Sequence, residues 1–475
     1  MSTTPAEAAK KNRTVLDQHG QSYELTGRIG EGGQGIVCTT NYPNVLVKVA
    51  RATSEEKRAS WTNKIRALMR QPLEGLPIAH PLALITQPQP GYVMELMDGL
   101  TPVAELMQVA TDALMSDEGL SGYVKTGGLL RRLKMLARLA RVLADLHGRG
   151  LAYGDLSPAN VFASQSLEYA EVWLIDADNV ASQSRDGQQG VFTPDYGAPE
   201  ILRGESGINT LTDSWSFAVM AYRLLTLVHP LKGDVVLEGE PEGEEAALRG
   251  ELPWVDHPTN RNNALSIGLP REIALNVPLR GLFERCFNAG LNSPGDRPGL
   301  NEWADAFEAA TGHCDQCESC GNTFFYNSKQ TCPFCDHPQG KDRTILLQEY
   351  RYMPPELLRY GLSEDVPESL IRKECWTRTG KAMVLNISPA ELKTLPLGTS
   401  LYADARPLCT VQLAKDGLWI EPSAGARISL QRASDDKVVE VASRQRLKTG
   451  SRSGASFWLH LGSVEEEHVV WRFNW

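Results

Sequence analysis

The stretch LAYGDLSPANVF, residues 151–162, decides the fold of most of this chain. It follows a segment of helical period, LLRRLKMLARLARVLADLHGRG (129–150), which ends in glycines, and it runs into an apolar segment. Asp155 and Asn160 therefore lie on a loop between a predicted helix and a predicted strand. A carboxylate and an amide on such a loop are suited to proton transfer and to binding a hard cation.

A second aspartate occupies a related place further along the chain. Sixteen residues after Asn160, VWLIDADN (172–179) ends an apolar strand on Asp176. Two carboxylates and an amide at strand ends and loops suit Mg²⁺ bound to a triphosphate, and one carboxylate remains to take a hydroxyl proton. The pattern indicates phosphoryl-transfer chemistry.

Upstream, YELTGRIGEGGQGIVCTT (23–40) alternates as paired strands do and carries the glycines Gly30, Gly32 and Gly35. A Gly-rich turn alone is a weak signal, since it is often only a hairpin. Eleven residues after Val37, however, Lys48 stands in the apolar strand VLVKVA, where an unpaired ammonium would be costly. Phosphate oxygens are a natural partner for this lysine.

The segment VMELMDG (93–99) passes from a strand into a loop and has backbone groups at Glu95 and Met97 that could bind an adenine edge. Three further segments follow the catalytic stretch in order: FTPDYGAPE (192–200), TDSWSFAVMAYRLLT (212–226) and RCFNAGLNSPGDRPGLNEW (285–303). With these pieces in this order, residues 22–311 resemble the protein kinase family.

The resemblance implies a two-lobed fold and a role for each matching residue. The glycine loop with Val37 would cover the phosphates of ATP, Lys48 would pair the α and β phosphates, and Glu95 and Met97 would bind adenine. Asp155 would be the catalytic base, while Asn160 and Asp176 would hold Mg²⁺. Glu200 would pair with Arg297, Asp213 would brace the catalytic loop, and Thr193 favours serine and threonine over tyrosine as acceptors.

Four departures from the family pattern are visible. Tyr153-Gly154 replaces His-Arg before the base, so switching through a phosphorylated activation loop is not expected. Ser157 replaces a lysine near the transferred phosphoryl, which predicts a low rate. Ala177-Asp178 replaces Phe-Gly, and Asp178 could add a metal ligand. The helix predicted over 55–70 has no glutamate at the usual depth, because Glu55 and Glu56 lie early and Asn63 is nearer that place. The partner of Lys48 stays open.

Three functions remain separable on this evidence. The first is an active serine/threonine protein kinase of bacterial type that uses ATP and Mg²⁺. The departures also allow a pseudokinase scaffold that binds nucleotide without turnover, and the YGDLS segment (153–157) allows a small-molecule kinase.

Five of the nine cysteines fall within residues 314–335. Cys317 and Cys320 form one CxxC pair and Cys332 and Cys335 another, with eleven residues between the pairs, which is the spacing of a zinc ribbon holding structural Zn²⁺. The fifth, Cys314, is left over or exchanges, and the nearby His313 and His337 are weaker alternatives. The ribbon is not basic, so nucleic acid is not an expected partner.

The predicted architecture is multidomain α+β. It has an N-terminal tail (1–20), a kinase-like domain (21–311, small lobe 21–98, large lobe 99–311), a zinc ribbon (312–340), a linker (341–380) and a β-rich domain (381–475), which short alternating strands predict to be a sandwich or barrel. Within the large lobe, the Glu-, Gly- and Pro-rich stretch 233–258 predicts a solvated loop.

Near the C-terminus, the β-rich domain carries a basic cluster and three tryptophans. Arg444, Arg446, Lys448 and Arg452 read as a solvated turn or as an anion site for a phosphoprotein or regulatory partner. Trp458, Trp471 and Trp475 are expected in the core.

Bulk properties agree with a globular multidomain chain. The 475 residues are 42% hydrophobic and 22% charged, with a formal net charge of −10. Neither an apolar signal region near the N-terminus nor an 18-residue apolar run is present, so we expect a soluble, cytoplasmic protein with a protein substrate and without a membrane or nucleic-acid partner.

Overall fold

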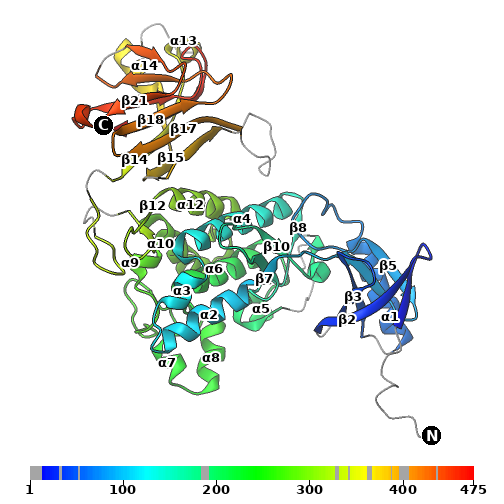
Figure 1. The fold of residues 1–475 in the computed structure, drawn as a ribbon. Coiled ribbons are helices and arrows are strands. Elements are labelled where there is room, and N and C mark those ends of the chain that lie inside the picture. Colours follow the sequence, from blue (N-terminus) through cyan, green and yellow to red (C-terminus); the bar gives the residue numbers. More distant parts are fainter. Residues whose placement is uncertain are drawn as a thin grey trace, which may run out of the picture. The chain divides into compact units, whose positions relative to one another are not determined.

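The computed structural model describes residues 13–31, 35–51, 54–182, 192–326, 331–340, 343–360, 366–386, 388–394, 406–434 and 437–475. The chain divides into two compact units (Figure 1). The first comprises Met1–Gly127, Met135–Pro270 and Arg280–Ala304, and the second comprises Gly128–Lys134, Arg271–Leu279 and Asp305–Trp475.

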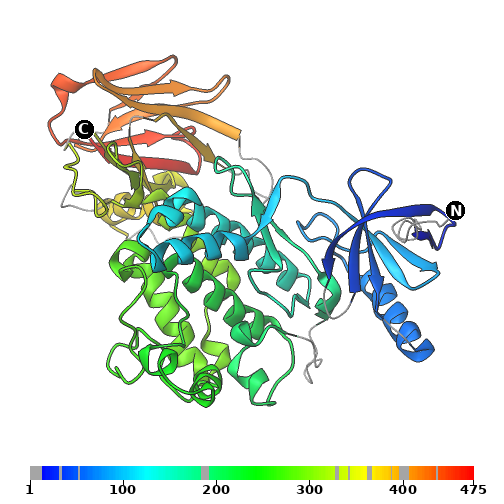
Figure 2. The same cartoon turned by 60° about the horizontal axis from the view of Figure 1, so that its bottom comes forward.

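The small lobe is a closed barrel in which neighbouring strands follow the order β1-β2-β3-β4-β6-β5. Its strands are β1 (Arg13–Asp17), β2 (Ser22–Glu31), β3 (Gly35–Thr40), β4 (Val45–Ala50), β5 (Ala83–Gln87) and β6 (Gly91–Glu95). Helix α1 (Glu55–Leu68) begins at the N-cap Ser54, whose hydroxyl accepts from the Lys57 N–H. It lies beside the barrel (Figure 2), where the Trp61 ring stacks on Tyr92 of β6.

Residues 100–312 are mainly helical. The longer helices are α2 (Val103–Met115), α4 (Gly128–Gly148), α6 (Thr210–Thr226), α10 (Val277–Glu284) and α12 (Leu300–Gly312). The shorter helices are α3 (Ser121–Lys125), α5 (Pro199–Leu202), α7 (Asp234–Leu237), α8 (Pro241–Leu248), α9 (Arg271–Ala274) and α11 (Gly290–Asn292). The short strands of this part are β7 (Leu100–Pro102), β8 (Leu151–Ala152), β9 (Val161–Ser164), β10 (Val172–Leu174) and β11 (Ala181–Ser182).

The stretch 233–258 is not the solvated loop that its composition predicts, because it contains α7 and α8. Pro241 begins α8 at a position where proline is favoured, and glutamates in the first turn suit the positive end of the helix dipole. Apolar residues spaced among the charges decide the outcome: Leu248, Trp254 and Val255 are all buried.

In the second unit, the cysteine-rich segment forms a hairpin of β12 (Cys314–Gln316) and β13 (Thr323–Phe325). The stretch 341–380, expected to be a linker, instead holds β14 (Ile345–Tyr352), α13 (Pro355–Arg359), α14 (Glu368–Glu374) and the start of β15 (Trp376–Leu385). Because β14 pairs with both β15 and β23, the C-terminal sheet already begins at Ile345.

Two sheets form the C-terminal β region, as the predicted sandwich requires. One has the order β15-β14-β23-β22-β19-β20 and the other β16-β17-β18-β21. The remaining strands are β16 (Ala390–Thr394), β17 (Arg406–Ala414), β18 (Gly417–Pro422), β19 (Ser429–Arg432), β20 (Val438–Glu440), β21 (Gln445–Lys448), β22 (Ser456–His460) and β23 (His468–Asn474).

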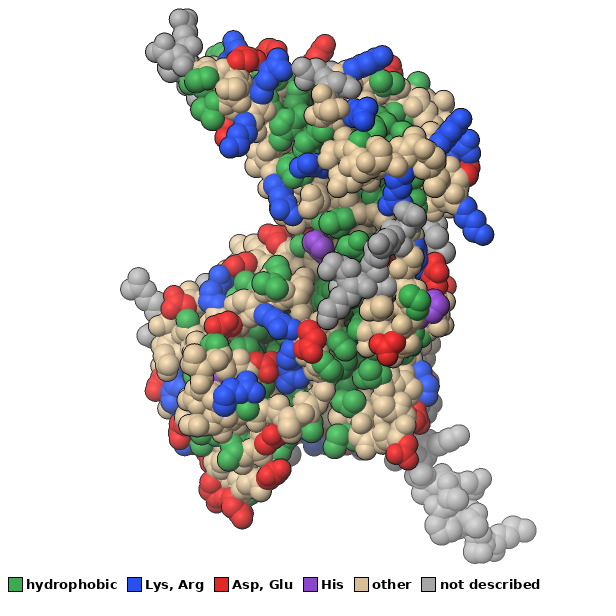
Figure 3. Space-filling view, turned by 90° about the vertical axis from the view of Figure 1, so that its left-hand side faces the viewer, with side chains coloured by type: hydrophobic (Ala, Val, Ile, Leu, Met, Phe, Trp, Pro, Cys, Tyr) green, Lys and Arg blue, Asp and Glu red, His purple; other side chains and the backbone are tan. Residues whose placement is uncertain are grey.

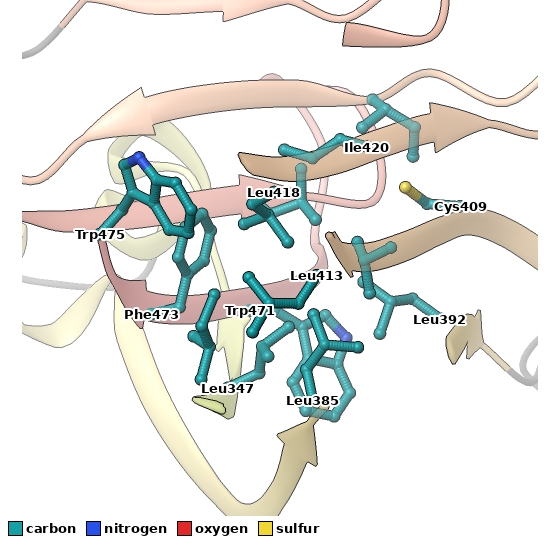
Figure 4. Close-up of a cluster of buried hydrophobic side chains, with 14 of the residues drawn as sticks. Leu347, Leu385, Leu392, Cys409, Leu413, Leu418, Ile420, Trp471, Phe473 and Trp475 are labelled. Atoms are coloured by element: carbon teal, nitrogen blue, oxygen red, sulfur yellow. The ribbon is translucent and has the colours of Figure 1, made fainter. Parts of the chain in front are cut away.

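Alternate residues of both sheets fill one shared core (Figure 4). Leu347 and Trp471 come from one sheet, and Leu413 and Ile420 from the other. Trp471 and Trp475 lie in this core as expected, whereas Trp458 is only half-buried and stacks on Trp376 at 4.2 Å between ring centroids. Among the described residues, none of the helices has the length and apolar character needed to cross a membrane.

Candidate active site

Asp155 and Asn160 meet on the loop between β8 and β9. The Asn160 Nδ2 donates to the backbone oxygen of Asp155 at 2.9 Å and to its Oδ2 at 3.2 Å. Thr193 approaches from a segment 38 residues later, and both its backbone N–H and its hydroxyl donate to Asp155 Oδ1 at 2.9 Å. Each carboxylate oxygen of Asp155 therefore has a fixed partner, which holds the group in one orientation.

The environment also tunes the ionisation of Asp155. Burial raises the pKa of this carboxyl above its ordinary value of 3.8, while the hydrogen bonds from Thr193 and Asn160 act to lower it. The carboxylate is thus a better proton acceptor than an exposed aspartate, and the donors around it keep the charged form stable.

Asp213 of α6 holds the start of this loop through hydrogen bonds to its backbone. Its carboxylate accepts the backbone N–H of Tyr153 at 2.6 Å and that of Gly154 at 2.9 Å, and the His147 Nε2 lies 3.0 Å from it. Gly154 has a φ of 87°, and a Cβ there would meet Ile208 at 2.9 Å, so glycine is required at this position. The contact that the family resemblance implied for Asp213 is present.

Lys48 finds two partners in the loop that follows β10. Its Nζ lies 2.7 Å from Asp176 Oδ1 and 2.7 Å from Asp178 Oδ2, and the Tyr92 hydroxyl donates to Asp178 Oδ1 at 3.0 Å. Burial alone would lower the pKa of Lys48, but the carboxylates of Asp178 and Asp176 raise it above its ordinary value. The sequence left this partner open, and the signal that could have found it was a second aspartate two residues after Asp176.

Of the expected nucleotide-binding residues, Val37 lies on β3, the strand next to that of Lys48, and Gly30 lies on β2, which pairs with the other edge of β3. In the antiparallel ladders, Val37 lies opposite Gly30 on one side and opposite Lys48 on the other. Gly35 begins β3, where a Cβ would meet Val49 O at 2.7 Å. Gly32, also expected in this loop, lies outside the described residues.

Glu95 and Met97 flank Leu96, whose N–H donates to Asn44 O at 2.9 Å. Because successive backbone groups of an extended chain point in opposite directions, those of Glu95 and Met97 face away from β4. The pairing of β5 with β6 ends at Val93, so it does not cover them. This edge is therefore a candidate site for an adenine ring.

A cavity of about 350 Å³ lies beside Thr193, which donates to Asp155. Its lining comes from α2, the catalytic loop and the segments around Thr193 and α6, and it includes Met107, Ser157, Pro158, Thr193, Tyr196 and Leu227. Ser157, which replaces the usual lysine, is itself buried.

A buried ion pair joins two distant segments of the helical part of this unit. Arg297 donates through both terminal nitrogens to Glu200, at 2.7 and 2.8 Å, and lies over the Trp215 ring at 4.9 Å. This is the Glu200–Arg297 pair that the family resemblance implied.

In the second unit, four cysteines converge. The Sγ atoms of Cys317, Cys320, Cys332 and Cys335 all lie within 4.8 Å of one another, with Cys317 to Cys335 at 3.7 Å and Cys320 to Cys332 at 3.6 Å. Four sulfurs about 2.3 Å from one zinc ion would lie about 3.8 Å apart in a tetrahedron. The donor set therefore fits structural Zn²⁺.

The four thiols of the cluster differ in acidity: burial raises the pKa of Cys320 and raises that of Cys332 to about 12, whereas Cys317 is more acidic than usual. Burial acts to raise the pKa of Cys317, but the backbone N–H groups of Cys320 and Ser319 and the neighbouring thiols lower it to about 6. The Gln339 amide also donates to Cys317 Sγ at 3.3 Å. Cys314 is outside the cluster, because its thiol points to the Ala310 carbonyl oxygen at 3.6 Å and burial raises its pKa to about 12.

The C-terminal basic cluster is engaged with its own domain. Arg446 pairs with Asp416, Arg444 lies 3.6 Å from Glu421, and both guanidinium groups lie over the Trp419 ring. Arg452 lies over Trp475 instead. Lysine and arginine side chains are spread widely over the face of this unit that Figure 3 shows, and two arginines of the cluster have acidic partners.

Comparison with known proteins identifies one domain of this chain. Residues 23–249 match the protein kinase domain. The chain is similar to serine/threonine-protein kinase pkn2 of Myxococcus xanthus, with 35% identity over 111 residues that cover 22% of this chain and 13% of that protein.

Two chlamydial proteins match over a longer range. Serine/threonine-protein kinase PknD of Chlamydia caviae is 26% identical over 259 residues, covering 49% of this chain and 26% of that protein. The PknD of Chlamydia pneumoniae is 27% identical over 262 residues, covering 49% and 28%. This chain thus spans between 13% and 28% of the length of these relatives.

Proposed function

Residues 23–249 of this chain are a protein kinase domain, and from that premise we propose that the protein transfers the γ-phosphoryl group of ATP to serine or threonine hydroxyls of a protein substrate. One observation carries the proposal. Asp155 is partly buried and accepts hydrogen bonds from Asn160 and Thr193, which orient it as a proton acceptor. In the same site, the Lys48 Nζ lies 2.7 Å from Asp176 Oδ1.

In the reaction, the substrate hydroxyl oxygen bonds to the γ-phosphorus, and the bond from that phosphorus to the bridging oxygen of ADP breaks. The hydroxyl proton passes to Asp155, while ADP leaves with the bonding electron pair. Lys48, already buried and charged, offers its ammonium to the α and β phosphates.

Asn160 and Asp176 supply suitable ligands for Mg²⁺. The Asp176 side chain is 32% exposed, and its backbone has a left-handed φ of 59°. The Asn160 nitrogen is occupied by Asp155, which leaves its oxygen for a cation. When bound, Mg²⁺ neutralises charge that develops on the transferred phosphoryl group.

Serine and threonine are the proposed acceptors because Thr193 reaches the base with its hydroxyl. Zn²⁺ at the four cysteines would be structural, since four thiolates complete a tetrahedral site and leave no position for a substrate. The β-sandwich would recruit a protein substrate or a regulatory partner.

Purified protein incubated with radiolabelled ATP and Mg²⁺ tests the proposal through label on the chain and on a generic protein acceptor. We expect Asp155→Asn and Asp176→Asn to abolish labelling. The matched control is Asp117→Asn, an exposed aspartate between α2 and α3, which should label normally. An unlabelled wild-type chain that nucleotide still stabilises would identify a pseudokinase scaffold, and label found only on small compounds would identify a small-molecule kinase.

A further inference from the structure

Lys48 requires a carboxylate that fixes its position, and helix α1 does not offer one. The acidic residues of α1 are Glu55 and Glu56, which stand in its first turn and are exposed. Lys48 is 6% exposed and bonds instead to the loop after β10. An ammonium buried to this degree is stable only with paired charges close by.

The two aspartates of this loop differ in what else they can do. The Asp178 side chain is fully buried, and its two oxygens are engaged by Lys48 and by the Tyr92 hydroxyl. The Asp176 side chain is 32% exposed and uses one oxygen for Lys48. A cation in the cleft can therefore reach Asp176, whereas Asp178 has neither solvent access nor an oxygen without a partner.

We propose that Asp178 is the positioning residue for Lys48, in place of a carboxylate from α1. This inference rests on the proposed function, since it assigns how the lysine of that same site is held. The loop 176–178 then supplies both the metal ligand and the lysine anchor, and the lysine stays in place without an acidic contact from α1.

Helix α1 contributes packing to this arrangement. Its Trp61 ring stacks on Tyr92 with 5.9 Å between centroids and 14° between planes, and Ile65 is fully buried. Tyr92 in turn donates to Asp178. The helix therefore shields the pair of Lys48 and Asp178 from water through the contact of Trp61 with Tyr92. It contributes no charged group to this pair.

The test compares Asp178→Asn, Lys48→Met and Asp176→Asn in the full chain. We expect Asp178→Asn to lower kcat at least tenfold and to weaken ADP binding measured in EDTA as much as Lys48→Met does, with the Mg²⁺ concentration for half-maximal rate unchanged. The double variant of Lys48 and Asp178 should bind ADP no more weakly than Lys48→Met alone. In contrast, Asp176→Asn should raise the Mg²⁺ requirement.

Two controls separate positioning from folding. Asp178→Glu should recover part of the rate, and Tyr92→Phe, which removes only one hydroxyl, should give a smaller loss. Glu55→Gln with Glu56→Gln should retain wild-type activity. If that pair of changes abolished activity, or if Asp178→Asn raised only the Mg²⁺ requirement, the proposal would be overturned. A wild-type chain without turnover in which Asp178→Asn still weakened ADP binding would refute the proposed function and leave this inference standing.

Discussion

At the scale of single residues, the site depends on polar groups that satisfy one another under burial. Asp155, Asp178 and Asp213 each accept hydrogen bonds from two or more donors, and all of the donors named here except Asn160 come from elements distant in sequence. A carboxylate that is buried with all its partners present is rigid, because loss of any partner costs about 1–3 kcal/mol. This rigidity positions the reacting groups.

A buried histidine gives a residue-scale prediction on pH. Burial lowers the pKa of His460 from its ordinary 6.5 to about 3, and its Nδ1 lies 2.8 Å from the Nε2 of His468. The unfolded chain binds a proton below pH 6.5 that the folded chain does not, so the stability of the β-sandwich is fully present above pH 6.5 and falls as pH drops towards 3. The slope is about 1.4 kcal/mol per pH unit for this one group.

Hydrogen exchange of β22 and β23, compared between pH 7 and pH 5 after correction for intrinsic rates, measures this slope. His460→Gln should flatten it, and His19→Gln, which changes an exposed histidine, should leave it unaltered. An equal slope in the wild type and in His460→Gln would contradict the assignment.

At the scale of elements, helix α6 connects the site to the rest of the first unit. Asn209 and Thr212 form a capping box at its start, which fixes the turn from which Asp213 reaches the catalytic loop. Trp215, one turn on, lies under Arg297, whose pair with Glu200 joins α5 to the segment before α12. Local capping and a buried ion pair thus hold the elements that surround the loop of Asp155.

Breaking that ion pair should destabilise the protein strongly. The Arg297 side chain is fully buried, so Glu200→Gln leaves a charge without its counter-ion and should cost about 3–5 kcal/mol of unfolding free energy. The matched control is Glu302→Gln, which breaks the exposed pair with Arg285 and should cost at most about 1 kcal/mol. Denaturant unfolding measures the free energy of unfolding of both variants. Similar losses of stability would show that burial does not determine how much an ion pair contributes.

At the scale of the whole molecule, the cysteine-rich hairpin differs from the first unit and from the β-sandwich in the size of its hydrophobic core. The first unit has large buried side chains such as Trp215, Phe283 and Trp303, while the hairpin of β12 and β13 has a small cluster made of Cys317, Cys332 and Phe324 with two half-buried neighbours. So small a core contributes little to stability, and a metal ion held by the four cysteines would supply the missing stabilisation.

Zinc should therefore stabilise the second unit. We expect one zinc ion for each chain by atomic absorption, with a lower melting temperature after chelation. Cys320→Ala should lose the ion, whereas Cys314→Ala, a change at the buried cysteine outside the cluster, should keep it. Full zinc occupancy in Cys320→Ala would contradict the four-cysteine site.

The sequence by itself determined those features that depend on local spacing. The five-residue separation of Asp155 and Asn160, the CxxC pairs and the alternation of the C-terminal strands each correspond to a short-range geometry that the chain adopts in place. The sequence also predicted the helix over 55–70 and the lack of a glutamate at the usual depth of that helix, since both follow from residue type and period.

Only the tertiary structure decided which distant groups meet. Nothing in the local pattern joins Lys48 to Asp178, 130 residues later, or places Tyr92 on the same carboxylate. Residues 233–258 and β14 were misjudged for a related reason: burial of Leu248 and Trp254, and pairing with β23, outweighed a composition typical of loops and linkers. Such contacts form because buried charges and apolar surfaces find partners across the fold, and sequence spacing does not encode that search.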